Sequence, residues 1–299
     1  MIRFSVVIPA YNYGHLLDRA VASACEQPGN DYEVIVVDDG STDQTPRVLK
    51  ELVARYPHLN VIRQDNAGPS AARNHGVVVA GGEWVLFLDA DDEMLPTALG
   101  DFRERLEISP SAEMVLAPTL SVFPDGREKL APVPVVASSP EQRFQDYLFK
   151  RLRLSNGAVL MARSLLLRFP FNPSLRQTED IPVFAHCLAA SGEVLAVSRA
   201  VVKIHKHDGS RRHGSDAALS VGMQLVDEVF DPSRLTQSCM RYKASYRARR
   251  ALSVFRILYR AGRLREARGY YREALSSDWR QALGKPGNLL KYFRALLTF

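Results

Sequence analysis

Residues 84–92 have the sequence WVLFLDADD, in which five apolar side chains precede an acidic run. The apolar part has the length and composition of a buried β-strand, so the carboxylates follow at its C-terminal end. Earlier apolar segments predict strands at Phe4–Ile8, Val34–Val37 and Leu59–Ile62, with amphipathic helical patterns between them. This alternation favours an α/β fold of the doubly wound type, with a mostly parallel sheet covered on both faces.

Polar residues follow three of these predicted strands. In a parallel sheet, ligands bind beyond the carboxyl ends of the strands, so we expect the three polar segments to converge on one cleft. They are Pro9-Ala10-Tyr11-Asn12, Asp38-Asp39-Gly40-Ser41 and Asp89-Ala90-Asp91-Asp92.

The composition is that of an ordinary globular protein. Of 299 residues, 46% are hydrophobic and 24% charged, so neither wholesale disorder nor a fibrous repeat is indicated. Three widely spaced cysteines, Cys25, Cys187 and Cys239, support neither a disulfide framework nor a zinc site. Pro9 interrupts the short N-terminal apolar run, and no later run is long enough to span a bilayer. We therefore expect a cytoplasmic protein.

The acidic run has two interpretations. Clustered carboxylates at the mouth of a buried sheet repel one another and attract a cation. Hard oxygen ligands suit Mg²⁺ or Mn²⁺, and sparse protein ligation leaves room for phosphate oxygens and water. The alternative is a solvated turn in which Asp91 or Asp92 caps a helix beginning near Leu95.

The segment after the second predicted strand, residues 38–43, also has two interpretations, ligand binding and helix capping. A carboxylate at Asp38 or Asp39 can accept a hydrogen bond from a pyrimidine N–H or a ribose hydroxyl. Alternatively, Ser41 or Asp43 leads a helix beginning at Thr45. Neither GxGxxG nor GxxxxGK[ST] occurs, so the common dinucleotide and P-loop sites are not indicated.

Four segments together resemble glycosyltransferase family 2 in their order and spacing. The resemblance implies a GT-A fold, a nucleoside-diphosphate-sugar donor, a divalent metal and inversion at the anomeric carbon. The segments are Val6-Val7-Ile8-Pro9-Ala10-Tyr11-Asn12, Val36-Val37-Asp38-Asp39-Gly40-Ser41-Thr42-Asp43, Asn66-Ala67-Gly68-Pro69-Ser70-Ala71-Ala72-Arg73-Asn74 and Phe87-Leu88-Asp89-Ala90-Asp91-Asp92.

The resemblance also implies roles for single residues. Asp91 matches the last acid of the family's DxD motif and is the expected metal ligand, with Asp89 contacting the ribose or a metal-bound water. Arg73 is expected near the donor base or diphosphate. The residues expected to surround the donor base and ribose are Pro9, Tyr11 and Asp39, with Ala10, Asn12, Asp38 and Ala90 in the same donor site.

A catalytic base is implied at Glu179-Asp180. Residues 171–180 resemble the family's stretch in which an aromatic-led turn precedes a Glu-Asp pair, and Asp180 matches the base. The family often has an aromatic directly after the pair, where this chain has Ile181-Pro182, so the acceptor side departs from the pattern. From the residues alone, the pair also suits the start of a helix at Ile181.

A histidine segment offers a second metal contact. His205-Lys206-His207-Asp208-Gly209-Ser210 resembles the family's Arg-x-His-x-Gly-Ser, with His205 in place of the arginine. By this match His207 contacts the metal or the diphosphate.

The C-terminal part is basic and helical. Patterns at Leu252–Tyr259 and Ala267–Leu275 predict two helices joined by a turn at 261–263. A net charge of +6 and the Arg-rich end suit a solvated face or peripheral contact with an anionic membrane. We expect no nucleic-acid partner. The predicted domains are 1–215, with a nucleotide-sugar half at 1–110 and an acceptor half at 111–215, and the helical region 216–299.

The leading hypothesis is an enzyme that transfers one hexose or deoxyhexose from a UDP- or dTDP-sugar to a hydroxyl of a glycan or lipid-linked glycan. Bacterial cell-surface polysaccharide or lipopolysaccharide assembly is the expected setting. A sugar-nucleotide nucleotidyltransferase is one alternative, but residues 9–12 lack the glycine-rich, lysine-bearing loop that it needs. A non-catalytic nucleotide- or carbohydrate-binding protein is the other, against which Asp39, Asp91 and Asp180 argue together.

Overall fold

The structure is a computed structural model of the chain, in which residues 2–175, 177–206, 215–284 and 286–297 are described. The chain divides into two compact units, residues 1–174 with 183–209 and residues 175–182 with 210–299. All the described strands belong to the first unit, and the described part of the second contains helices. A domain boundary at 215 stays a prediction. Glu179 and Asp180 count with the second unit.

A seven-stranded sheet forms the centre of the first unit, in the order β10-β6-β9-β4-β1-β2-β3. β1 pairs in parallel with β2 and β4, whereas β9 is antiparallel to β4 and β6. The predicted α/β fold with a mostly parallel sheet is therefore confirmed. The strands are β1 Phe4–Ala10, β2 Tyr32–Asp38, β3 Leu59–Arg63, β4 Trp84–Phe87, β6 Ala112–Leu116, β9 Val159–Ala162 and β10 Glu193–Ala196.

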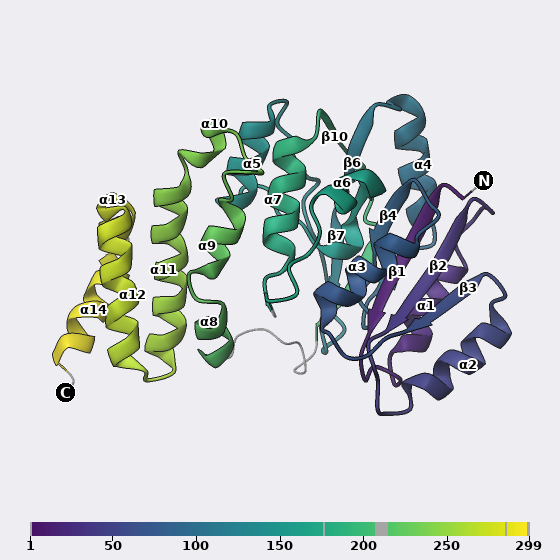
Figure 1. Ribbon diagram of the computed structural model, residues 1–299, viewed down its shortest axis with the longest axis horizontal. Helices are drawn as coiled ribbons and strands as arrows, with labels where there is room; N and C mark the ends of the chain where they lie inside the picture. Colours follow the sequence, from purple (N-terminus) through teal and green to yellow (C-terminus); the bar gives the residue numbers. More distant parts are fainter. Residues whose placement is uncertain (1, 176, 207–214, 285, 298–299) are drawn as a thin grey trace. The chain divides into compact units, whose positions relative to one another are not determined.

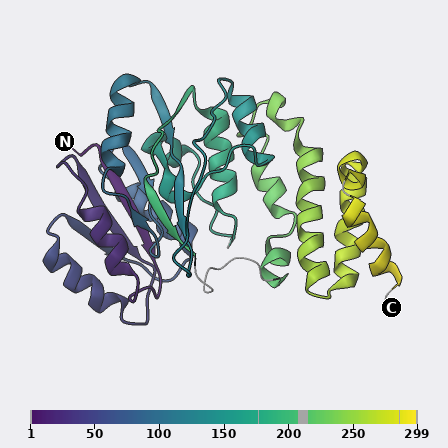
Figure 2. The same cartoon turned by 180° about the vertical axis from the view of Figure 1, so that it is seen from behind.

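The central strands are mostly apolar because helices cover both faces of the sheet. Val6, Val7 and Ile8 of β1 are completely buried. Helices α1 and α3 both contact β1 and β2, and they lie on opposite faces of the sheet (Figures 1 and 2). The three helices predicted between the strands are α1 Leu17–Cys25, α2 Thr45–Arg55 and α3 Pro69–Val79, and α4 Ala98–Ile108 follows them.

The strand order reverses at β1. From β1 the chain passes through α1 to β2 and then to β3 on one side, whereas α3 returns it to β4 on the other side of β1. In open α/β sheets, such a reversal leaves a crevice beyond the carboxyl ends of the two strands. Here those ends lead into Tyr11-Asn12 and Asp89–Asp92, the segments that the sequence predicts to line a ligand site.

A second, four-stranded sheet begins directly after the acidic run, in the order β5-β11-β7-β8. Its strands are β5 Glu93–Met94, β7 Thr119–Val122, β8 Glu128–Leu130 and β11 Val202–His205. Sequence patterns predict a loop at 124–140, but β8 lies within it. This strand was missed because its three residues are all exposed and carry no apolar alternation.

Four further helical segments of the described chain lie between α4 and β10. The last of them, α7, has its first three residues assigned to the second unit and the rest to the first. They are α5 Pro140–Leu148, the 3₁₀ turn η1 Asn156–Ala158, α6 Arg163–Arg168 and α7 Asp180–Ala190. The helix predicted at Ile181 therefore begins one residue earlier.

The second unit is built on a helical hairpin of α11 and α12. Phe255, Leu258 and Tyr271 form the buried interior between them. Gly262, at φ +74°, makes the turn in the predicted position. No helix within the described part of the chain combines the length and the apolar character needed to cross a membrane. The helices are α8 Ser215–Val221, α9 Gln224–Val229, α10 Gln237–Met240, α11 Lys243–Arg260, α12 Leu264–Ser277, α13 Trp279–Leu283 and α14 Pro286–Leu297.

Gly76 sets how closely α3 approaches β1. A Cβ at this position would lie 2.3 Å from Val7 Cγ1, and the β-branched, fully buried Val7 has no room to turn away. We therefore expect Gly76→Ala to lower the free energy of unfolding by about 1–3 kcal/mol, as overpacking does. Urea denaturation measures the change.

Gly100 in α4 is the matched control, since a Cβ there has no neighbour within 4 Å. Gly100→Ala should leave stability unchanged or raise it by up to about 1 kcal/mol, because alanine favours a helix. An equal loss in both variants would contradict the close approach of α3 to β1.

Candidate functional site

The loops after β1 and β2 are joined through Asn12. This residue has φ +57°, a left-handed conformation that asparagine tolerates better than most residues. Its backbone N–H donates to Ser41 Oγ at 3.0 Å, and its side-chain Oδ1 accepts from the N–H of Thr42 at 2.8 Å. The side-chain oxygen of Asn12 is thus used within the protein. Its predicted contact with a donor stays a prediction.

The buried carboxylate of Asp38 holds the loop after β2 in place through hydrogen bonds. Its side chain is 2% exposed, and Oδ2 accepts a hydrogen bond from Arg63 Nη1 at 2.6 Å. Oδ1 accepts from the N–H of Ser41 at 2.9 Å. Both carboxylate oxygens therefore hold the protein's own groups, which gives Asp38 a positioning role.

Asp39 brings the loop between β3 and α3 to the end of β2. Its Oδ1 accepts from Gln64 Nε2 at 2.7 Å and from the N–H of Ala67 at 2.9 Å, and Oδ2 accepts from the N–H of Gly68 at 2.8 Å. A carboxylate offers about four lone-pair sites, so capacity for one more donor remains.

Gln64 is itself held by His75 of α3, whose Nδ1 donates to Gln64 Oε1 at 2.8 Å. Sequence reasoning missed Gln64 and His75 because both lie just outside the segments that carry the family pattern.

Arg73 of α3 and Asp89 at the end of β4 form an ion pair, with 2.9 Å between Nη2 and Oδ1. The arginine side chain is 6% exposed and the aspartate 39% exposed, so Asp89 is the member that a ligand would meet. The guanidinium also lies 5.5 Å from the ring centroid of Phe171. Direct contact between Arg73 and a donor stays a prediction.

The acidic run is a tight turn anchored to both sheets. The N–H of Asp92 donates to the carbonyl of Asp89 at 3.0 Å, and Asp92 Oδ1 accepts from the N–H of His205 at 3.0 Å. Arg19 of α1 donates to the carbonyl of Asp91. The capping interpretation is wrong, because α4 starts after Thr97 and has no side-chain cap.

Negative charge is concentrated in this turn. Burial raises the pKa of Asp92 to about 8, and the charges of Asp89 and Asp91 add to the rise. Asp91 is half-buried, whereas Asp92 is only 6% exposed. The turn therefore combines one buried acid with two acids that are partly exposed, Asp89 and Asp91.

The described residues contain no group of three or more His, Cys, Asp and Glu side chains placed to hold a metal ion. Asp89 and Asp91 still fit Mg²⁺ or Mn²⁺ in donor chemistry, since these ions accept a few carboxylate oxygens and complete their shells with phosphate and water. His205 donates from Nε2 to Glu93 Oε2 at 3.3 Å. His207 lies outside the described residues.

The remaining residues predicted to contact a donor line the same strand ends. Pro9 and Tyr11 are half-buried around the end of β1, whereas Ala10 and Ala90 are buried. Backbone pairing links two of these ends, because the N–H of Asp39 donates to the carbonyl of Ala10 at 2.9 Å. The structure thus brings together the segments after β1, β2 and β4.

Asn74 fixes the turn at Phe171. Its Nδ2 donates to the carbonyl of Phe171 at 2.8 Å, and its Oδ1 accepts from the N–H of Phe171 at 2.9 Å. The Phe171 ring packs edge-on against Phe87 of β4, with 5.3 Å between centroids. Sequence reasoning gave Asn74 no role, although it follows Arg73 in the third family segment.

Glu179 and Asp180 stand where α7 begins, directly after Thr178. Thr178 has φ +58°, an outlier for a β-branched residue that costs about 1–3 kcal/mol and that marks functional segments. Within the second unit, burial raises the pKa of Tyr246 to about 12, and the negative charge of Asp180 contributes to that rise. Asp180 therefore lies near the first half of α11.

The family model described as "Glycosyl transferase family 2" matches residues 5–162, which are more than half of the chain. This chain belongs to glycosyltransferase family 2. The matched range contains the segments after β1, β2 and β4 and ends with β9, before the Glu179-Asp180 pair.

Curated family-2 relatives differ in how much of the chain they share. The succinoglycan biosynthesis protein ExoU of Rhizobium meliloti is 28% identical over an alignment of 249 positions, and the match covers 75% of this chain and 71% of that protein. Several other relatives match over only 32–35% of this chain and 16–31% of their own length.

Solved structures share the fold over nearly the whole chain. Residues 1–349 of S. aureus TarS in complex with UDP-GlcNAc align with a TM-score of 0.60 at 18% identity, covering 95% of this chain and 93% of that one. The mannosyltransferase PcManGT of Pyrobaculum calidifontis, in complex with GDP-Man and Mn²⁺, aligns with a TM-score of 0.59 at 20% identity, covering 99% and 81%. The predicted GT-A fold is confirmed.

The two hydrogen bonds between Asn74 and the backbone of Phe171 can be tested by substitution. Asn74→Asp keeps the size of the side chain but replaces the Nδ2–H donor with an oxygen that faces the Phe171 carbonyl. We expect the free energy of unfolding to fall by about 1–3 kcal/mol, the usual cost of losing a buried hydrogen-bond partner. Urea denaturation at neutral pH measures it.

Asn172→Asp is the control in the same turn. Asn172 uses Oδ1 to accept from the N–H of Ser174, and an aspartate keeps that acceptor. Because this acceptor is kept, the free energy of unfolding of Asn172→Asp should fall by less than that of Asn74→Asp. A loss as large as that of Asn74→Asp would show that any added charge in this turn is destabilising and would contradict the role given to the Asn74 hydrogen bonds.

Proposed function

We propose that this family-2 enzyme is an inverting glycosyltransferase that transfers a single hexose or deoxyhexose from a UDP- or dTDP-sugar to a hydroxyl of a glycan or lipid-linked glycan. The setting we propose is assembly of bacterial cell-surface polysaccharide or lipopolysaccharide, in the cytoplasm or at the cytoplasmic face of the inner membrane. The observation that carries the proposal is the convergence of the segments after β1, β2 and β4 beside the acidic turn.

The donor half of the site is organised before a donor arrives. Asp39 holds the 64–68 loop and keeps capacity for one hydrogen bond from a base or ribose. Asp89 is held by Arg73, which fixes the direction of its carboxylate without neutralising the whole turn. Such fixed groups lower the reorganisation needed when the sugar nucleotide binds.

A divalent metal suits the leaving group. Asp91 would hold the ion, with Asp89 beside it and substrate oxygens completing the shell. Bound there, Mg²⁺ or Mn²⁺ supplies Lewis-acid stabilisation of the negative charge on the departing diphosphate. Support comes from the carboxylate donor set and from the Mn²⁺ in the PcManGT complex.

Asp180 is the proposed base. Inversion requires a group that accepts the proton of the acceptor hydroxyl as that oxygen attacks the anomeric carbon from the face opposite the diphosphate. The strained Thr178 directly before the Glu179-Asp180 pair supports this assignment, because such strain persists where the surrounding structure enforces a particular backbone path.

Removing the proposed metal ligand tests the donor half. We expect the affinity of Asp91→Ala for a nucleotide sugar, measured with Mn²⁺ present, to be no higher than the affinity of the wild type measured in EDTA. A thermal-shift screen of nucleotide sugars identifies the ligand, since a ligand at about 100 times its Kd adds about 2.7 kcal/mol of stability.

Glu107→Ala, which removes an exposed acid of α4, is the control and should keep the full Mn²⁺-dependent shift. Wild-type binding and turnover that EDTA leaves unchanged would contradict the metal proposal.

Loss of the proposed base should change the rate of sugar transfer without changing the affinity for the donor. Asp180→Asn keeps the shape of the side chain but cannot accept a proton, so we expect unchanged donor affinity and sugar transfer that is slower by about 10²–10⁴-fold. Calorimetry with the donor from the screen measures affinity, and release of the nucleoside diphosphate with acceptor present measures transfer. Asp227→Asn, an acid of α9, is the control. Full activity of Asp180→Asn would rule out this base.

A further inference from the structure

Helix α14 carries apolar side chains on two opposite sides. One side belongs to the core of the second unit, where Ala295 is buried and Leu289 and Tyr292 pack against that core. The other side exposes Leu290, Phe293 and Leu297, at 54%, 53% and 80%. Their spacing of three and four residues places them in one stripe along the helix. The core of the second unit therefore covers only part of the apolar surface of α14.

Helix α13 carries two further exposed apolar residues. Trp279 and Leu283 are 59% and 42% exposed, and their spacing of four residues places them on one side of α13. The guanidinium of Arg280 lies 5.4 Å from the ring centroid of Trp279. Helices α13 and α14 contact each other. Trp279, Leu283, Leu290, Phe293 and Leu297 are called the C-terminal apolar surface below.

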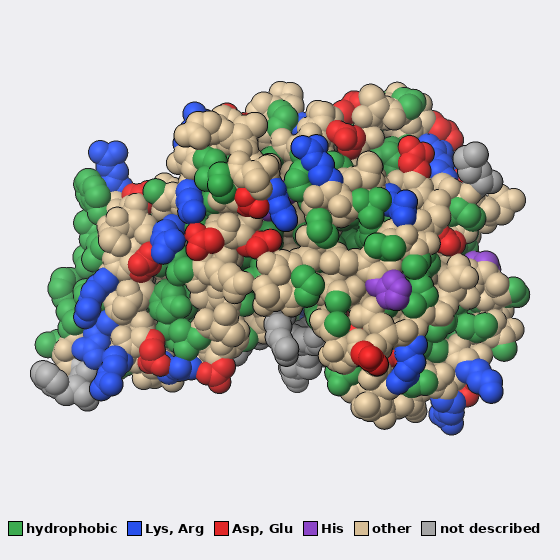
Figure 3. Space-filling model, viewed as in Figure 1, with side chains coloured by type: hydrophobic (Ala, Val, Ile, Leu, Met, Phe, Trp, Pro, Cys, Tyr) green, Lys and Arg blue, Asp and Glu red, His purple; other side chains and the backbone are tan. Residues whose placement is uncertain are grey.

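The polar groups around this surface are basic. Residues 279–297 contain four Lys and Arg residues and no Asp or Glu. Arg294 is exposed and lies one turn from both Leu290 and Leu297 along α14. In Figure 3, hydrophobic and basic side chains adjoin along the left edge, over the C-terminal helices.

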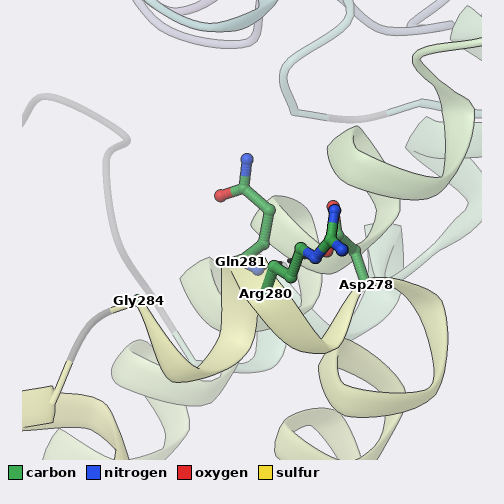
Figure 4. Close-up of a pocket in the computed structure, with 4 residues that line it drawn as sticks. All are labelled: Asp278, Arg280, Gln281 and Gly284. Carbon is green, nitrogen blue, oxygen red and sulfur yellow. Dashed lines mark hydrogen bonds between the residues drawn. The ribbon is translucent and has the colours of Figure 1, made fainter.

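A shallow hollow at α13 continues the polar rim. Asp278, Arg280, Gln281 and Gly284 line it, and in Figure 4 the side chains of Arg280 and Gln281 project from the helix. The carboxylate of Asp278 accepts hydrogen bonds from Ser245 Oγ and from the N–H of Gln281. The one acid at this rim is therefore occupied by the protein, and Arg280 leaves the rim basic.

We propose that the C-terminal apolar surface binds an anionic lipid bilayer, with α14 lying in the plane of the interface. Single exposed apolar residues are ordinary, but five of them on two adjoining helices are not. An apolar surface whose own helices, residues 279–297, carry four cationic residues and no acid matches the two attractions of an anionic bilayer, its acyl chains and its headgroups. This inference concerns residues outside the proposed transfer site and does not depend on the sugar transferred.

Vesicle binding tests the proposal. The full chain is sedimented with vesicles of phosphatidylcholine alone and of phosphatidylcholine with phosphatidylglycerol. We expect binding to the anionic vesicles that weakens as salt is added. The triple variant Leu290→Ser, Phe293→Ser and Leu297→Ser should bind at least about tenfold more weakly, since each substitution removes apolar area that the bilayer would bury.

The variant residues are exposed, so circular dichroism and thermal unfolding should match the wild type. Ile108→Ser with Leu167→Ser, two exposed apolar residues of α4 and α6, is the matched control and should bind vesicles as the wild type does. Nucleotide-sugar binding should be unchanged in both variants, which separates this test from that of the transfer site.

Three outcomes would overturn the proposal. One is a wild-type chain that does not bind anionic vesicles, and another is a triple variant that binds as well as the wild type. The third is a wild-type dimer that the triple variant abolishes, measured by light scattering, without vesicle binding. That result would assign the surface to a second copy of the chain.

Discussion

The parallel pairing of β1 with both β2 and β4 is the constraint on which the site depends. Because the chain reaches these neighbours through helices on opposite faces, their carboxyl ends open into one crevice. Gly76 lets α3 lie close to β1, and from the same helix Arg73 reaches Asp89 at the end of β4 while Asn74 holds the backbone of Phe171. The geometry of the donor half thus follows from backbone pairing before any ligand is considered.

Within that crevice, the aspartates divide into two kinds. Asp38, Asp39 and Asp92 are almost fully buried, and their oxygens hold neighbouring loops through backbone N–H groups. Asp89 and Asp91 are more exposed and remain the acids that a metal or a sugar nucleotide would meet. Buried acids are costly unless hydrogen-bonded, so each inward carboxylate here stabilises a specific loop position. Rigidity of the loops and negative charge at the crevice come from the same short segments.

Sequence patterns predicted the alternating elements of the first half because the core strands are mostly apolar and the helices are amphipathic. The polar segments that follow three of the predicted parallel strands predicted the crevice. The second sheet was harder, since β5 has two residues and β8 is wholly exposed. Partners such as Gln64 and Asn74 were not foreseeable, because a polar side chain in a loop or on a helix does not show which backbone group it will meet. The cap proposed for Asp91 or Asp92 failed because tertiary contact with His205 replaced the local one.

The central claim is that the acidic turn after β4 binds a divalent ion together with the donor diphosphate. Anomalous diffraction at the manganese edge, from a crystal grown with Mn²⁺ and a nucleoside diphosphate, tests it most directly. The account predicts a peak in coordination contact with the Asp91 carboxylate and with the diphosphate oxygens. A diphosphate bound in the crevice with no anomalous peak at Asp91, or with the ion held by other side chains, would contradict it.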